Sequence, residues 1–120
     1  MSTVESTFDL YDLREHLAAG DAAALGTHLA GDVVWSVIDQ RTPPAAPGVI
    51  HGRDAVVAMV ESVVARGIVS HVTDGFVAGD RGALQVTCTY PTGEQVVEHA
   101  LIELRNGRIA RWSSVQAWDE

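Results

Sequence analysis

The second half of the sequence consists of four apolar runs that alternate with polar residues and are separated by short turn motifs. In the clearest run, Leu84, Val86 and Cys88 occupy every second position, which is the period of a β-strand with one buried face. The third run is followed by Asn106-Gly107, a dipeptide that favours a tight hairpin because both residues tolerate positive φ. Short turns make consecutive strands antiparallel neighbours. The predicted strands span residues 69–77, 82–90, 95–104 and 109–118.

The first half of the sequence carries helical patterns that can cover such a sheet. Leu10, Leu13 and Leu17 recur at helical spacing, and we expect this helix to start near Ser6, which has capping-box spacing to Asp9. Two further helices are predicted. The second is capped by Asp21 and stops at Gly31, and the third opens at Gly52 and Asp54 and stops at Gly67.

A single strand is predicted between the second and third helices, over residues 32–39. A loop over residues 40–48 follows it, because three prolines there lack the backbone donor that a sheet ladder needs. One face of the sheet must be covered, and the three N-terminal helices are the available cover. The sequence therefore predicts an α+β fold, with a curved antiparallel sheet packed on three N-terminal helices.

The composition of the chain indicates how many domains it has, which compartment it suits and which partners are not expected. The chain has 120 residues, 47% of them hydrophobic, which suits one globular domain over residues 1–120, with residues 1–5 expected to be disordered. The net charge of −8 repels phosphate backbones, so nucleic acid is not an expected partner. No apolar run is long enough to span a bilayer, and the N-terminus lacks a secretion signal. The single cysteine, Cys88, fits a reducing cytoplasm, and we expect it to be a small core residue.

Four segments, taken in order, carry a family resemblance: Ala19-Gly20-Asp21, residues 29–35, residues 50–55 and residues 105–112. Together they resemble the nuclear transport factor 2-like superfamily, and within it the SnoaL-like polyketide cyclase and ketosteroid isomerase-like branch. The resemblance implies a cone-shaped sheet around a mostly apolar pocket, and homodimers formed through the outer sheet face. It also implies enzymes that handle small lipophilic molecules by acid/base chemistry, with neither a metal nor an organic cofactor.

The acidic positions implied by that resemblance are apolar in this chain. Val37 occupies the position of the general base, Leu13 that of the helix tyrosine and Ala100 that of the second aspartate. The cyclases often carry an aspartate near the end of the last strand, where this chain has Ala117. Neither standard mechanism therefore transfers to this sequence in its known form.

The candidate catalytic residues are Asp39, His71 and His99. Histidine titrates near neutral pH and suits proton transfer, and related dehydratases use a histidine pair with an aspartate. Asp39 shares strand parity with Trp35 and Val37, which directs it toward the pocket mouth. A solvated aspartate in the loop is the alternative for Asp39, and parity also allows His99 to lie on the dimer face.

The candidate substrate-binding residues are Trp35, Met59, Tyr90 and Trp112, which offer large apolar contact surfaces. Their alternative role is plain core packing. His16 and His28 are expected on helices and partly exposed. No pair of histidines has the spacing of a zinc motif, so no metal site is predicted.

Two functions remain open from the sequence. The first is a small-molecule isomerase, cyclase or dehydratase acting on a lipophilic carbonyl or polyketide-like compound. The second is a non-catalytic module of the same fold that binds a small ligand or mediates dimerisation. A cavity lined by no titratable side chain would favour the binding module, and a buried carboxylate beside a histidine would exclude it.

Overall fold

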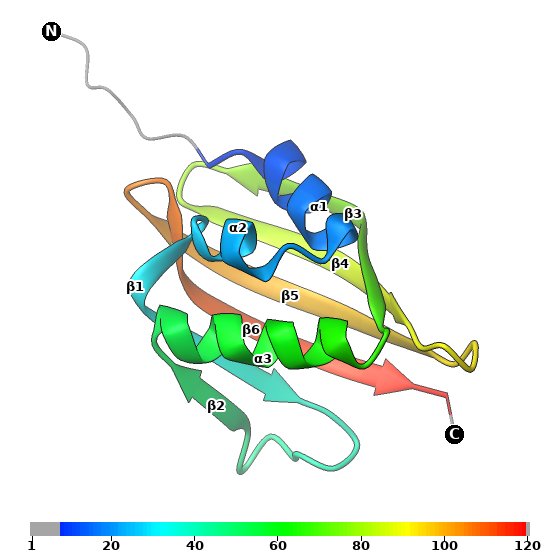
Figure 1. Ribbon diagram of the computed structural model, residues 1–120. Coiled ribbons are helices and arrows are strands. Elements are labelled where there is room, and N and C mark those ends of the chain that lie inside the picture. Colours follow the sequence, from blue (N-terminus) through cyan, green and yellow to red (C-terminus); the bar gives the residue numbers. More distant parts are fainter. Residues whose placement is uncertain (1–7, 120) are drawn as a thin grey trace, which may run out of the picture.

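A curved six-stranded sheet forms one layer of the fold, and three helices lie across one of its faces (Figure 1). The computed structural model describes residues 8–119, so the predicted helix start at Ser6 and the predicted disorder of residues 1–5 lie outside the described residues. The helices are α1 (Leu10–Ala19), α2 (Ala22–Gly26) and α3 (Arg53–Ala65). The strands are β1 (Leu29–Ile38), β2 (Gly48–His51), β3 (Val69–Ala78), β4 (Arg81–Thr89), β5 (Gln95–Arg105) and β6 (Arg108–Trp118). The predicted α+β fold class is confirmed.

The strand order in the sheet is β2-β1-β6-β5-β4-β3. Strands β3 to β6 pair as antiparallel neighbours, as their short turns require. Strand β1 pairs with β6 in parallel, with Trp35 opposite Trp112. The sheet is therefore mixed, which corrects the expectation of a purely antiparallel one. Strand β2, which the sequence did not predict, returns antiparallel beside β1 after the proline-rich loop.

Local side chains and glycines fix the ends of the first two helices. The Asp9 carboxylate accepts a hydrogen bond from the Asp12 backbone N–H at 3.0 Å, so Asp9 is the N-cap of α1. Gly20 ends α1 with a φ of 70°, in the left-handed region that glycine adopts without a steric cost. The Asp21 carboxylate caps α2 as predicted, at 3.0 Å from the Ala24 backbone N–H. Helix α2 ends at Gly26, well before the predicted stop at Gly31, because β1 already begins at Leu29.

The core lies between the helices and the inner face of the sheet. Leu13 of α1, Leu25 of α2 and Val56 of α3 are all buried, and strand residues of the inner face complete the core. Burial alternates along β5, where Val96, Glu98, Ala100 and Ile102 are buried and the residues between them are exposed. This alternation assigns each strand position to the covered face or to the uncovered one. Among the described residues, no helix is long and apolar enough to cross a membrane.

Gly82 on β4 tests this packing. A Cβ at Gly82 would lie 2.7 Å from the backbone oxygen of Phe76 and 3.1 Å from side-chain atoms of Val77 and Ile102. Strand β3 would have to move, so we expect Gly82→Ala to lower the free energy of unfolding by about 1–3 kcal/mol. Urea denaturation would measure the change.

Gly31→Ala is the matched control, because a Cβ at Gly31 meets no atom within 4 Å. This variant should be as stable as the parent or up to about 1 kcal/mol more stable, since alanine restricts the unfolded chain. Equal stabilities of the two variants would contradict the packing described for β3 and β4.

Candidate functional site

A cavity of about 290 Å³ lies between the helices and the inner face of the sheet. Leucine, isoleucine and valine side chains form most of its wall, and five polar side chains interrupt that wall. Apolar pockets with a few placed polar groups are the usual form of small-molecule sites, and this volume is near the lower end of their range. The polar members are Ser70, Cys88, Tyr90, Glu98 and Gln116.

Glu98 is the central polar residue of this cavity. Its position on β5 directs the side chain toward the helices, and only 6% of the residue is exposed. The carboxylate accepts a hydrogen bond from the Trp112 indole Nε1–H at 3.2 Å. An indole N–H can only donate, so this bond fixes Glu98 as the acceptor and orients the carboxylate. Glu98 is the one acidic side chain in the described part of the chain that is buried. A carboxylate held in an apolar cavity can take a proton from a bound molecule and return it.

Sequence reasoning missed Glu98, although a signal for it was present. The family resemblance placed Ala100 at the acidic position of this strand, and Glu98 lies two residues earlier on the same face. Of the other aligned positions, Val37 and Leu13 line the cavity. Ala117 is exposed, and its neighbour Gln116 lines the cavity instead. The inward parity of β5 alone would have selected Glu98.

Ser70 and Cys88 form a second polar contact on the cavity wall. The Ser70 Oγ and the Cys88 Sγ lie 3.3 Å apart across the β3–β4 pair. Burial raises the pKa of the Cys88 thiol, the Ser70 hydrogen bond acts in the opposite direction, and the nearby Glu98 charge raises the pKa further. Cys88 is therefore a protonated thiol at neutral pH, and the thiol is a poor nucleophile. Cys88 lines the cavity and also packs against the core.

The four residues predicted to bind substrate, Trp35, Met59, Tyr90 and Trp112, all line the cavity. Trp35 and Trp112 stack with ring centroids 4.1 Å apart and planes 3° from parallel, so the two rings pack against each other as one apolar part of the wall. The Arg66 guanidinium lies 5.8 Å from the centre of the Tyr90 ring. Contact of these side chains with a substrate stays a prediction.

The structure does not bring together Asp39, His71 and His99, and none of the three lines the cavity. Asp39 follows the end of β1, and its carboxylate accepts from the Arg41 backbone N–H at 2.8 Å. His71 is exposed on β3 between the inward-facing Ser70 and Val72. His99 is exposed on β5, with its Nε2 2.9 Å from the Gln85 Oε1. The predicted triad is thus corrected: strand alternation directs both histidines to the uncovered face, while Asp39 closes its own turn.

His28 also differs from expectation. It lies in the turn between α2 and β1 rather than on a helix, and it is buried. Burial lowers the pKa of His28, and the neighbouring His16 lowers it further, against the raising effect of Asp12 and Asp9. The three side chains Asp12, His16 and His28 form a polar cluster, and none of them lines the cavity.

The comparisons with known proteins agree on the fold. A model of the SnoaL-like domain matches residues 10–112. A nuclear transport factor 2-like protein of unknown function from Mesorhizobium loti has a TM-score of 0.76 at 22% identity, covering 89% of this chain and 86% of that one. A candidate ketosteroid isomerase from Kribbella flavida has a TM-score of 0.72 at 20% identity, covering 92% of this chain and 74% of that one.

A third solved structure, from Methylobium petroleophilum, is a protein of unknown function with a cystatin-like fold. Its TM-score is 0.75 at 10% identity, and the match covers 92% of this chain and 74% of that one. The comparison with curated proteins finds no significant match. At these identities the solved structures support the shared fold.

The environment of Cys88 predicts slow alkylation. The pKa of Cys88 in the folded protein lies above the ordinary value of 9.0. Near pH 9, a smaller fraction of Cys88 is therefore present as the reactive thiolate in the folded protein than in the unfolded protein. We expect iodoacetamide to modify native Cys88 far more slowly than the same protein in urea, with the native rate still rising above pH 9.0. Mass spectrometry over time measures both rates directly, because Cys88 is the only cysteine. Equal native and unfolded rates would place the thiol in solvent and contradict the cavity wall described above.

Proposed function

The chain belongs to the SnoaL-like domain family of the nuclear transport factor 2-like superfamily, and we propose that it is a small-molecule enzyme using acid/base chemistry. Its substrate is a lipophilic carbonyl or polyketide-like compound, and its reaction an isomerisation, cyclisation or dehydration. The observation that carries this proposal is the Glu98 carboxylate, 6% exposed within an apolar cavity. A cavity of about 290 Å³ favours a compact substrate over a large polycyclic one.

Glu98 acts as the proton carrier in this proposal. A carbonyl makes the neighbouring C–H acidic because the resulting negative charge moves onto oxygen as an enolate. Glu98 removes that proton and returns it to another carbon. Alternatively, the enolate carbon attacks a second carbonyl and closes a ring, and the alkoxide formed there takes the proton back from Glu98. The Trp112 N–H holds the carboxylate in place during both steps. This role replaces the one predicted for Asp39, His71 and His99.

The enolate oxygen needs hydrogen-bond donors within the same cavity. Ser70, Tyr90 and Gln116 each carry a donor and line the wall around Glu98. A donor aimed at the developing charge stabilises the transition state more than the ground state. The stacked rings of Trp35 and Trp112 provide part of the apolar wall against which the substrate lies.

Glu98→Gln tests the proposed acid/base role. The amide preserves the size of the side chain but cannot take a proton, so we expect turnover to fall by roughly 10²–10⁴-fold. A panel of small ketones, enones and linear polyketide-like compounds supplies the substrates, and quenching of tryptophan fluorescence reports binding. Binding should change far less than turnover.

Glu103→Gln is the matched control, because Glu103 lies on the same strand but is exposed beside Arg111. It should leave turnover unchanged. Turnover that survives Glu98→Gln would refute the proposed role.

A ligand-binding module without catalysis is the second candidate function. The observation that favours it is the apolar character of Val37, Leu13 and Ala100 at the positions where relatives in the resembling branch carry their acidic and tyrosine side chains. In addition, no histidine stands beside Glu98 on the described cavity wall. Saturable quenching of tryptophan fluorescence by compounds that are never converted would select this function over the enzyme.

We also propose that two copies of the chain associate through the uncovered face of the sheet. Large apolar side chains are exposed there on three strands: Phe76 on β3 is 63% exposed, Leu101 on β5 is 68% and Val115 on β6 is 57%. Leu101 lies in register between Ala83 and Ser113, near the middle of this face. A contiguous apolar patch is typical of an interaction site, and a two-fold dimer uses one patch twice.

Leu101→Lys tests this dimer, because an ammonium group buried at the interface would lose its hydration without a partner charge. We expect the parent protein to have twice the chain mass by light scattering after size exclusion, and Leu101→Lys to have the mass of one chain. Tyr11→Lys on α1 is the control, since Tyr11 is 71% exposed but lies on the helical layer. A monomeric parent, or a dimeric Leu101→Lys variant, would contradict the proposed interface.

A further inference from the structure

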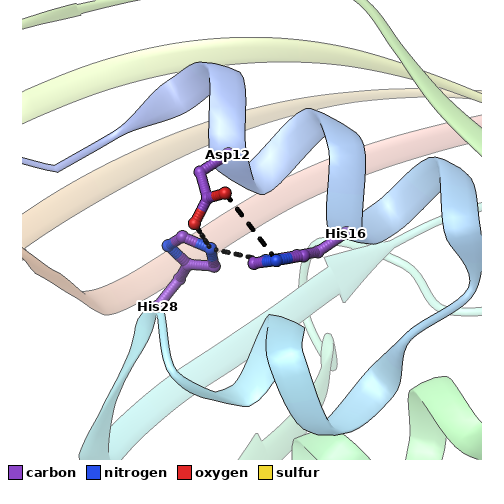
Figure 2. Close-up of side chains that lie close together, drawn as sticks. All are labelled: Asp12, His16 and His28. Atoms are coloured by element: carbon purple, nitrogen blue, oxygen red, sulfur yellow. Dashed lines mark hydrogen bonds and ion pairs between the residues drawn. The ribbon is translucent and has the colours of Figure 1, made fainter.

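Three metal-ligating side chains converge between α1 and the turn before β1 (Figure 2). Asp12 and His16 lie one helical turn apart and so share a face of α1. His28 approaches from the turn between α2 and β1. The His16 Nδ1 lies 3.0 Å from the His28 Nε2, and the Asp12 carboxylate lies 3.5 Å from the His28 Nε2 and 3.7 Å from the His16 Nε2.

We propose that Asp12, His16 and His28 bind a divalent transition-metal ion of the zinc type. Two imidazoles and one carboxylate are a ligand set that such ions accept. Tetrahedral coordination with metal–ligand bonds near 2.1 Å separates the donor atoms by about 3.4 Å. One ligand atom from each of the three residues can be chosen so that all three atoms lie within 4.8 Å of one another, and the His16 Nδ1 and the His28 Nε2 are already 3.0 Å apart. Side-chain rotations that bring an Asp12 oxygen closer to these two nitrogens would seat an ion.

The three side chains stand on backbone that is already fixed. The Asp9 cap holds the first turn of α1 at the Asp12 backbone N–H, and the His16 carbonyl accepts from the Asp21 N–H at 3.1 Å. The His28 backbone N–H donates to the Leu25 carbonyl at 3.0 Å, and its carbonyl accepts from the Ile109 N–H at 2.8 Å. A ligand set on rigid elements loses little entropy when it binds, which raises affinity.

The surroundings favour a cation and leave room for it. Asp9 lines the same surface cleft as His28 and adds a second carboxylate near the cluster. Arg105 and Arg108 line that cleft too, and the Arg105 guanidinium is paired with Asp32. Side-chain exposure is 50% for Asp12 and 28% for His16, so solvent reaches the cluster. Three protein ligands and access for water correspond to a zinc site with one open position.

The facing nitrogens of His16 and His28 can share a proton or bind one metal ion. In a metal-free protein only one proton can lie between the His16 Nδ1 and the His28 Nε2, so one ring donates and the other accepts. With an ion present, both nitrogens and the carboxylate direct lone pairs at one point. Phe8 packs edge-on against the His28 ring, with centroids 5.8 Å apart, and limits how far that ring can turn away.

Calorimetric titration of the untagged full chain with zinc chloride tests the proposal. We expect one ion per chain in the parent. Asp12→Asn and His16→Gln should each weaken zinc binding by at least about tenfold. Residues that only orient a metal ligand already change metal affinity by about 10–100-fold, and a direct ligand should matter at least as much. Both side chains are partly exposed, so these variants should fold, and far-ultraviolet circular dichroism verifies it.

His51→Gln and His71→Gln are the matched controls, because both histidines are exposed and lie outside the cluster. They should bind zinc like the parent. Zinc should raise the melting temperature of the parent and of both controls but not that of His16→Gln, while magnesium, which prefers oxygen ligands, should change none of them. Absence of zinc binding in the parent, or binding that His16→Gln leaves unchanged, would overturn the proposal. Neither result depends on turnover in the cavity, so this test and that of Glu98 fail separately.

Discussion

The stacked pair of Trp35 and Trp112 is the contact on which the sheet and the cavity both depend. The two residues face each other across the parallel β1–β6 pair, and so they join the first strand to the four that end the chain. Their rings lie 4.1 Å apart, and Trp112 is 3% exposed. The same Trp112 indole donates to Glu98. The Trp112 side chain thus packs β6 against β1, forms part of the apolar wall and orients the buried carboxylate.

The sequence was sufficient for the elements whose evidence is local. Strands β3 to β6 lie within one residue of their predicted bounds, because each alternates with period two and ends at a turn motif. The pairing of β1 with β6 depends on residues far apart in the chain, and alternation carries no information about it. Strand β2 has four residues, and none of them is fully buried, so neither burial nor length distinguished it from the preceding proline-rich loop.

The apolar lining of the candidate site was predicted from the sequence, but its carboxylate was not. Trp35, Met59, Tyr90 and Trp112 could be named because size and inward parity suffice to place a side chain on the inner face. Glu98 was missed because the family resemblance implied an acidic side chain at Ala100, two residues further along the same face of β5. His99 has the opposite parity from Glu98, and the chemistry of histidine outweighed that signal in the prediction.

Helix α1 links the cavity to the cluster of Asp12, His16 and His28, because its two faces serve the two sites. Leu13 and Leu17 line the cavity, while Asp12 and His16 face His28 (Figure 2). The helix has only ten residues, too few to be stable without packing. Contacts on either face of α1 therefore stabilise the helix as a unit. An ion that clamps Asp12 and His16 to His28 also restrains Leu13 and Leu17, and with them one wall of the cavity that surrounds Glu98.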